Sequence, residues 1–397
     1  MTIHVLIIGA GAIGTCTAYY LSQREDIQIT VVERCKVASA SSGKAGGFLW
    51  SEGDGILSLK SYNLHKELAE ALDGEKFYGY RTLDTYSVTM TSQENEKDAK
   101  QVKKKVNDNV PWLNQERVTT CDELGNKNET AQVHPKLFTI TLMTAAEATG
   151  NVKLICGNGV KELLYDDYDS ELIRGVLLDN GDKILADHVV ACVGPWAEMF
   201  PIKLNSSSMM NDAILRQHHN KNNNRGLPIT SARAHSIVIR VPRTSPIGAQ
   251  ALFTCILDGS KMYEPEVYPR PDHTVYMCGI QDRTVPLPPT ADLVKVDPKA
   301  IDRLKYTAGL ISPHLDTREQ NLLAEQACYL PISLDGSPLV GKHPNYKNLY
   351  ISGGHSVWGI LLSPVSGLMM TELLMDGKIT CVPQDLVKKL SLDSRLD

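Results

Sequence analysis

The sequence lacks an excess of basic residues. Its 397 residues include 41 Lys and Arg against 46 Asp and Glu, which gives a net charge of -5. There is no long basic run, so we do not expect a nucleic acid as a partner. No uninterrupted apolar stretch reaches the roughly 18 residues that a spanning helix needs, so we expect no membrane span.

The sequence also lacks the patterns of metal sites and disulfide frameworks. Its nine cysteines are odd in number and scattered, and neither C-x-x-C nor H-E-x-x-H occurs. The first apolar strand begins at Ile3, which leaves no room for a cleavable signal. We therefore predict no bound metal and a reducing, cytoplasmic location. The length of the chain exceeds the usual size of one core and predicts two domains.

The first 34 residues have the pattern of a dinucleotide-binding unit. Val5–Ile8 predicts a buried parallel strand, Ala12–Arg24 a helix, and Gln28–Val32 a second strand. Between the first strand and the helix lie three glycines in the spacing G-x-G-x-x-G: Gly9, Gly11 and Gly14. Together these elements predict a dinucleotide site. The alternative is a tight strand–helix turn that binds nothing.

Each residue of this unit has a mechanical role. Gly9 allows the tight turn. Gly11 allows a pyrophosphate to approach the backbone, and Gly14 allows the helix to pack closely on the strand. The positive end of the helix faces the phosphates. Glu33 can accept hydrogen bonds from a ribose diol. NAD and FAD both fit this stretch.

Two further segments are rich in small residues. Val37–Trp50 contains a run of small residues that ends in Ala45-Gly46-Gly47, with Lys44 before it. Such a loop lets the backbone pass close to a flat ligand; the alternative is a flexible loop. Lys44 faces either a phosphate, a flavin edge or solvent. Near the other end of the chain, a strand at Leu349–Ser352 leads into a glycine-rich turn.

The C-terminal turn precedes a predicted helix. Ser363 stands where an N-cap residue belongs and Pro364 where the first helical residue belongs, and the helix is predicted to end near Met375. Three glycine-rich segments, at residues 9–14, 43–47 and 353–359, are more than a nicotinamide cofactor needs. A longer cofactor that crosses several strand ends fits better, which disfavours an NAD-dependent dehydrogenase.

The middle of the chain predicts two kinds of sheet. Strands over residues 160–165, 171–179 and 183–186 indicate an antiparallel meander, because Asn180-Gly181 is a strong hairpin turn. Strands over residues 236–241, 251–257, 262–268 and 274–280 indicate a second, mostly antiparallel sheet. A polar segment over residues 204–226 separates these two regions.

Six segments resemble the motifs of one flavoprotein family: residues 9–34, 39–47, 159–160, 186–196, 331–341 and 348–360. The chain is similar to the D-amino-acid oxidase type of FAD-dependent oxidoreductases, which includes glycine oxidase, sarcosine oxidase and dimethylglycine dehydrogenase. The resemblance implies an α/β fold: a Rossmann-like FAD-binding domain with a parallel sheet and a β-meander, and a mostly antiparallel α+β substrate domain. We assign residues 1–85, 136–230 and 325–397 to the first domain and residues 86–135 and 231–324 to the second.

The resemblance also implies a reaction. A hydride passes from the carbon next to an amine or amino-acid nitrogen to flavin N5, and oxygen or another acceptor reoxidises the flavin. The backbone N–H groups of Gly359 and Ile360 are predicted to stabilise the reduced flavin. The residues predicted to contact FAD are Gly9, Ala10, Gly11, Ala12, Ile13, Gly14, Glu33, Arg34, Ser41, Ser42, Gly43, Lys44, Ala45, Gly46, Gly47, Val160, Val193, Gly194, Trp196, Gly354, His355, Ser356, Val357, Trp358, Gly359 and Ile360.

Three residues are the predicted catalytic candidates: His355, Trp358 and Tyr276. The alternative for His355 is a histidine packed at a strand end. A substrate carboxylate would need an Arg or Tyr of the second sheet, and five are candidates: Arg233, Arg240, Tyr263, Tyr268 and Tyr276. Cys328 stands at the offset where sarcosine and fructosamine oxidases bond FAD covalently. A small core cysteine is the favoured interpretation, with FAD held non-covalently.

Some residues depart from the family pattern. Ser333-Leu334 replaces the usual Thr-Pro, and Ser356-Val357-Trp358 replaces small residues beside the flavin. The segment SSGKAGGFL is similar to a fungal branch of the family linked to late-endosome-to-Golgi transport. The alternative function is therefore a flavin-binding protein with a trafficking role, weak turnover and an endosome association. Trp358 and the polar segment 204–226 favour that alternative.

Overall fold

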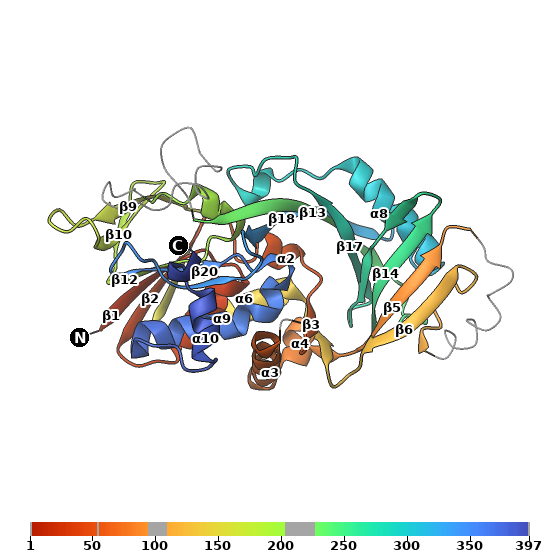
Figure 1. Cartoon of the computed structure of the whole chain (residues 1–397), viewed down its shortest axis with the longest axis horizontal. Helices are drawn as coiled ribbons and strands as arrows, with labels where there is room; N and C mark the ends of the chain where they lie inside the picture. The colour runs from red at the N-terminus through yellow and green to blue at the C-terminus, as the bar shows by residue number, and fades with distance from the viewer. Residues whose placement is uncertain (1, 54, 94–108, 203–226, 396–397) are drawn as a thin grey trace.

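A six-stranded, mainly parallel sheet forms the centre of the computed structural model, which describes residues 2–53, 55–93, 109–202 and 227–395 (Figure 1). In spatial order its strands are β19 (Leu339–Lys342), β20 (Leu349–Gly353), β12 (His188–Ala191), β1 (Ile3–Ile8), β2 (Ile27–Glu33) and β8 (Val152–Cys156). Only β19 runs antiparallel to its neighbour within this sheet. The apolar residues predicted for the first two strands pair directly, with Val5 opposite Ile29.

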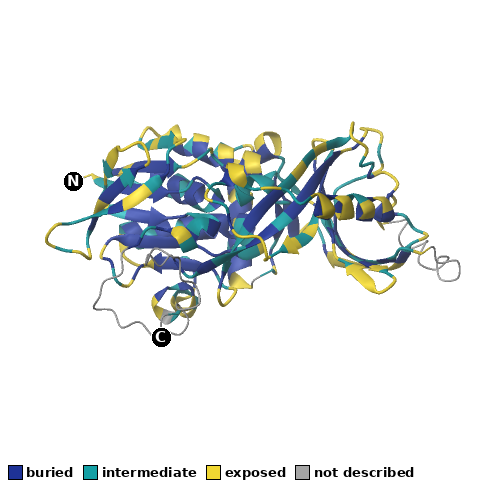
Figure 2. Ribbon diagram, turned by 90° about the horizontal axis from the view of Figure 1, so that it is seen from above, coloured by how far each residue is buried: buried dark blue, intermediate teal, exposed yellow. Residues whose placement is uncertain are grey.

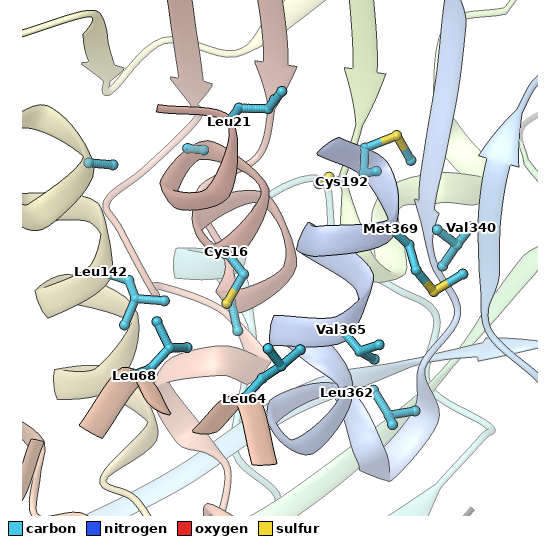
Figure 3. Close-up of a cluster of buried hydrophobic side chains, with 14 of the residues drawn as sticks. Cys16, Leu21, Leu64, Leu68, Leu142, Cys192, Val340, Leu362, Val365 and Met369 are labelled. Atoms are coloured by element: carbon cyan, nitrogen blue, oxygen red, sulfur yellow. The ribbon is translucent and has the colours of Figure 1, made fainter. Parts of the chain in front are cut away.

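Four helices build the largest core against this sheet: α1 (Ala12–Ser22), α3 (Ile56–Ala71), α6 (Pro135–Glu147) and α9 (Gly359–Asp376). Figure 3 shows side chains of these helices in this core, where Leu68 of α3 and Leu142 of α6 lie side by side near Cys16 of α1. Helices α1 and α9 pack closely because Gly367 has no side chain: a Cβ there would lie 2.6 Å from the carbonyl carbon of Cys16. The first and last large helices of the chain are thus neighbours.

The predicted meander lies beside the parallel sheet. Its strands, in spatial order, are β11 (Lys183–Leu185), β10 (Ile173–Leu178) and β9 (Val160–Tyr165). Apolar side chains of the meander, such as Leu163 and Val176, share a core with Leu6 and Val189 of the parallel sheet. A small sheet on another side joins β3 (Phe48–Trp50), β7 (Thr130–Gln132) and β4 (Arg81–Thr82).

A large, mostly antiparallel sheet makes up the other half of the described chain. Its path is β18 (Leu322–Ser333), β13 (Ile229–Arg240), β17 (Thr274–Asp282), β16 (Glu266–Pro269), β14 (Gln250–Asp258), β5 (Asp84–Thr91) and β6 (Val118–Gly125), with β15 (Lys261–Tyr263) paired to β14. Strands β14 and β5 are parallel. Figure 1 shows β13 and β18 running from the parallel-sheet side toward the rest of this sheet. We call it the large sheet.

Helix α8 (Pro298–Ile311) covers the large sheet. Asp297 caps the helix by accepting a hydrogen bond from the Lys299 N–H at 3.0 Å. Figure 2 shows buried and exposed residues alternating around α8. The remaining short elements are α2 (Ser41–Lys44), α4 (Gly74–Tyr78), α10 (Gln384–Leu390) and the 3-10 turns η1 (Gly194–Met199), η3 (Ala291–Leu293), η4 (Ser356–Trp358) and η5 (Asp393–Arg395).

The start of the last long helix differs from the prediction. Helix α9 begins at Gly359, so Pro364 lies inside it and Ser363 is not its N-cap. The proline has no N–H to donate to the carbonyl of Ile360 four residues earlier. Two side chains donate to that carbonyl oxygen instead: the imidazole Nε2 of His65, on α3, at 2.9 Å, and the Ser363 hydroxyl, within α9, at 2.8 Å. These two contacts let the helix continue through the proline.

The same segment bears on the expectation that no helix spans a membrane. Residues 356–376 are long and apolar enough to cross a membrane, with a mean hydropathy of 1.5 over the best window. Of that window, 67% is buried inside the protein. Helix α9 packs on α1 and α3, as the core helix of a globular protein does.

Candidate cofactor and active site

One cavity of 460 Å³ runs along the carboxyl ends of the parallel strands and under the large sheet. Its size is within the usual range of ligand sites. Residues of all three predicted glycine-rich segments line it, together with residues of β16, β17 and β18. Segments from both ends of the sequence and from the large sheet therefore meet around one space.

The N-terminal glycines shape one end of the cavity. Gly9 has a φ of +104°, and a Cβ there would lie 2.4 Å from the carbonyl oxygen of Cys192. Gly14 does not line the cavity, and its Cβ would lie 2.0 Å from the Gly9 carbonyl oxygen. It therefore serves the close packing of helix on strand that the spacing predicts. Gly11, Ala12 and Ile13 line the cavity, and the Ala12 N–H donates to Ser42 Oγ at 2.9 Å.

Glu33 and Arg34 line the same end. The Glu33 carboxylate accepts hydrogen bonds from the N–H groups of Ala10 and Cys35, each at 2.9 Å. Ala10 itself does not line the cavity, so its N–H holds Glu33 in place. The Arg34 guanidinium pairs with Asp179 at 2.6 Å.

Glycine 159 makes room for Arg34. A Cβ on Gly159 would lie 2.2 Å from the guanidinium carbon. Arg34 also donates to the Val160 carbonyl at 3.3 Å, and Val160 lines the cavity as predicted. This contact fixes the meander against the first βαβ unit.

The small-residue loop lines the middle of the cavity. Ser41, Ser42, Lys44, Ala45 and Gly46 contribute to the wall, and the Lys44 ammonium donates to the Ala327 carbonyl at 2.9 Å. Two predicted contacts lie behind this wall. A Cβ on Gly43 would lie 2.0 Å from the Ala38 carbonyl oxygen, and one on Gly47, whose φ is +84°, would lie 2.0 Å from the Val133 carbonyl oxygen.

The turn after β12 closes another side. Val193, Gly194 and Trp196, three of the predicted FAD contacts, line the cavity. The indole N–H of Trp196 donates to the Pro288 carbonyl at 2.8 Å. Pro288 belongs to the segment between β17 and α8, so this bond joins the large sheet to the parallel-sheet half beside the cavity.

The C-terminal turn contributes His355, Ser356, Val357, Gly359 and Ile360. The two other predicted residues of the turn lie outside the lining. Gly354 has a φ of +75° and makes the bend. The Trp358 indole packs toward Gly53, where a Cβ would lie 3.3 Å from the ring. Trp358 packs against the helical core and does not line the cavity.

His355 is a buried and oriented side chain. It is 2% exposed, and its Nε2 lies 2.8 Å from the Ser366 hydroxyl. Burial lowers the pKa of His355 to about 3, so the imidazole is neutral at physiological pH. Its Nδ1 is buried and has no hydrogen-bond partner among the described residues. A bound ligand in the cavity would supply such a partner.

The first turn of α9 is held from behind by α3. His65 Nε2 lies 2.9 Å from the Ile360 carbonyl oxygen and 3.2 Å from that of Leu361. Ser61 Oγ donates to the Leu361 carbonyl at 2.5 Å and accepts from the Val365 N–H at 3.2 Å. These contacts fix the turn whose Gly359 and Ile360 face the cavity. The sequence gives no signal for them, because the partners are about 300 residues apart.

The large sheet forms the roof over the small-residue loop. Tyr276 lines the cavity, and its hydroxyl donates to the Lys44 carbonyl at 2.8 Å. Of the other four candidates for binding a carboxylate, none lines the cavity within the described residues: Arg233, Arg240, Tyr263 and Tyr268. Arg233 pairs with Asp282 at 2.8 Å.

Sequence reasoning missed three polar residues of the roof: Glu266, Cys278 and Gln281. Glu266 pairs across the strands with Cys278, and Tyr268 with Tyr276, so these four share one face. The register of β13 and β17 shifts between Ser236 and His235, which skips Gly279 and turns Gln281 to the same face. Only the pairing of the strands reveals this face.

Cys328 also lines the cavity from β18. It is 7% exposed, and burial raises the pKa of its thiol to about 11. A thiol with a raised pKa is a poor nucleophile. The environment favours the predicted core cysteine over a covalent link to a cofactor.

Comparison with known proteins gives the family. The family model described as "DAO: FAD dependent oxidoreductase" matches residues 4–373. The chain belongs to this family of FAD-dependent oxidoreductases. A putative oxidoreductase of Schizosaccharomyces pombe is 32% identical over 409 residues, covering 97% of each chain. The putative oxidoreductase TDA3 of Saccharomyces cerevisiae is 27% identical, covering 99% of this chain and 95% of its own.

Solved structures give the same fold. The crystal structure of glycine oxidase from Bacillus cereus matches with a TM-score of 0.70 at 19% identity, and covers 95% of this chain and 98% of its own. The residues of the DAO-family chain described above fit FAD. Gly9 and Gly14 leave no room for a Cβ, one cavity continues from Glu33 to Tyr276, and the buried Nδ1 of His355 has no hydrogen-bond partner among the described residues. The Glu33 end suits the ribose of FAD and the end under the large sheet suits its ring.

Proposed function

We propose that this oxidoreductase oxidises an amine or an amino acid at the bond between carbon and nitrogen. The observation that carries the proposal is the cavity, which joins the Glu33 end to a polar roof under the large sheet. Glycine oxidases of Bacillus subtilis and Geobacillus kaustophilus, each 22% identical to this chain, support the class of substrate. FAD, when bound, accepts a hydride from the carbon next to nitrogen at its N5.

The chain contributes the positive, N-terminal end of helix α9 to the cavity wall. The backbone N–H groups of Gly359 and Ile360 open α9 at the cavity wall, and no acidic residue lies in the first turn. Helix starts stabilise negative charge. Charge that builds up on the bound ring during the reaction is therefore stabilised there, while His65 and Ser61 keep the turn in place.

His355 contacts the bound ligand with an uncharged imidazole. Its Nε2 is held by Ser366, and burial keeps the pKa far below neutral pH. A histidine with a pKa of about 3 takes no proton at pH 7, so we do not assign it as the general base. Its Nδ1 instead contacts the ligand.

The large sheet excludes water from the reacting end. Phe48, Tyr268 and Tyr276 pack as one apolar cluster between the small-residue loop and the roof. The ring of Phe48 stacks on Tyr268 with centroids 5.6 Å apart, and Tyr268 stacks on Tyr276 at 6.2 Å. A dry site suits hydride transfer, because water does not compete for the reactive groups.

Two measurements test the proposal. An absorbance spectrum of the purified protein should have flavin bands, and mixing with a panel of amines and amino acids without air should bleach them. Reoxidation with oxygen and with artificial acceptors then identifies the acceptor class. A protein that carries FAD but is reduced by no member of the panel would refute the proposed reaction and support the trafficking alternative, whose segment 204–226 lies outside the described residues.

A further inference from the structure

Glu266 is the carboxylate of the cavity roof. It lies on β16, is partly buried and lines the cavity. Its Oε2 accepts a hydrogen bond from the Tyr268 hydroxyl at 2.8 Å and from the Cys278 thiol at 3.4 Å. Its Oε1 accepts no hydrogen bond from the described residues. One oxygen is thus fixed to the sheet and the other remains for a ligand.

Among the described residues, no cation pairs with this carboxylate. Its two partners, Tyr268 and Cys278, are neutral donors, and burial together with the charge of Glu266 raises the pKa of both well above the usual values. Both groups therefore stay protonated and continue to donate. A buried charge without a counter-ion is unfavourable, so a cation that enters the cavity gains from meeting it.

The groups that could bind a carboxylate are turned to other partners. Arg270 lies behind the roof, with its guanidinium 5.2 Å from the centre of the Tyr276 ring, and donates to the Ala45 carbonyl at 3.2 Å. Arg270 does not line the cavity. Among the described lining residues the cations are Arg34, which is paired with Asp179 at the other end, and Lys44, whose ammonium donates to Ala327.

We propose that the substrate is an amine without a carboxylate, and that Glu266 binds its positive charge. This inference rests on the proposed function and narrows it from amines and amino acids to cationic amines. Glu266 is a specificity-determining residue, because an ionised carboxylate pairs with an ammonium group and repels a substrate carboxylate.

A pair of inert probes of the same shape tests the charge preference. tert-Butylammonium carries the cation and has no hydrogen on the carbon next to nitrogen, so it binds without being oxidised. Pivalate has the same shape and carries a carboxylate. Each is titrated into the FAD-loaded protein, and binding is followed by the shift of the flavin absorbance and by the melting temperature.

We expect tert-butylammonium to bind and pivalate to bind much more weakly. Glu266→Gln keeps an acceptor for Tyr268 and Cys278 but removes the charge, and should weaken tert-butylammonium binding by about tenfold or more. Glu264→Gln, an exposed position two residues earlier, is the matched control and should change nothing. With an amine that reduces the flavin, Glu266→Gln should raise KM and leave kcat nearly unchanged.

Two results would overturn the inference: preferred binding of pivalate, or a Glu266→Gln protein that binds tert-butylammonium as the wild type does. Reduction of the flavin by amino acids but not by simple amines would also overturn it while leaving the proposed function intact. A flavin that nothing reduces would instead refute the proposed function, and the probe titrations would still decide the charge preference of the cavity.

Discussion

Replacement of His65 by leucine should loosen the turn of α9 that faces the cavity. Pro364 cannot donate to the Ile360 carbonyl, and His65 lies 2.9 Å from that oxygen. Leucine fills a similar volume but has no donor. The Ile360 carbonyl then keeps only the hydrogen bond that the Ser363 hydroxyl donates at 2.8 Å, and the loss of the other bond costs about 0.5–1.5 kcal/mol of the free energy of unfolding. We also expect weaker FAD retention, because Ile360 lines the cavity.

The expected shift in melting temperature follows from the size of the chain. Unfolding entropy is about 2.1 cal/mol/K per residue, so for 397 residues it is about 0.8 kcal/mol/K. A loss of about 0.5–1.5 kcal/mol therefore lowers the melting temperature by about 1–2 °C. His65→Gln keeps a donor near the position of Nε2 and should lose less. Asn63→Ala, exposed on the same helix, is the control.

A second substitution tests whether His65 supplies the donor that Pro364 lacks. Pro364→Ala restores an N–H that can donate to the Ile360 carbonyl within the helix. In that background His65→Leu should cost much less, and the two changes should couple in a double-mutant cycle measured by thermal melting and FAD titration. Purely additive effects, or a His65→Leu protein that melts and holds FAD like the wild type, would show that His65 does not repair the proline defect.

Three further predictions concern the glycine turn, the buried histidines and the cofactor link. Gly14→Ala places a Cβ 2.0 Å from the Gly9 carbonyl oxygen, so it should abolish FAD binding and sharply reduce soluble yield, measured by flavin absorbance against protein. Burial lowers the pKa of His65 to about 4 and of His355 to about 3, below the unfolded value of about 6.5. Their contribution to stability is therefore present above pH 6.5 and lost as pH falls toward 4, which urea midpoints from about pH 7.5 to 4.5 should record; a flat profile would contradict it. Cys328→Ser should leave FAD release unchanged, because acid precipitation of the wild type should already leave the flavin in the supernatant; yellow pellets from the wild type alone would contradict a non-covalent cofactor.

Much of the fold could be predicted because local rules determine it. The strand–glycine–helix pattern at residues 3–33 and the hairpin at Asn180-Gly181 depend on backbone conformations that few residues adopt. Strand β18 was not predicted, because LLAEQACYLPIS mixes polar and apolar residues without a clear period. Its long pairing with β13 stabilises it instead, and such pairing is invisible in a short window.

The site was predictable to a different extent at its two ends. The contacts near Glu33 depend on motif spacing, which the sequence displays directly. The roof depends on which face of β16 and β17 turns inward. Side chains alternate between the two faces of a strand, so the sequence alone is compatible with either face lying inward. Trp358 shows the opposite difficulty: its position in a glycine-rich turn suggested a ligand contact, but its size suits the helical core. Pro364 likewise has the sequence context of a first helical residue. It lies inside α9 instead, where the distant residue His65 contacts the Ile360 carbonyl.

The order in which the chain is made has a consequence for how this enzyme matures. The glycine turn after β1 leaves the ribosome long before β20, which pairs with β12, and α9, which packs on α1. During most of synthesis the nascent chain has half a cofactor site and an open strand edge. A premature stop before Leu349 would remove both β20 and α9. Such a product would lack half of the cofactor site and would expose the edge of β12, so we expect it to aggregate.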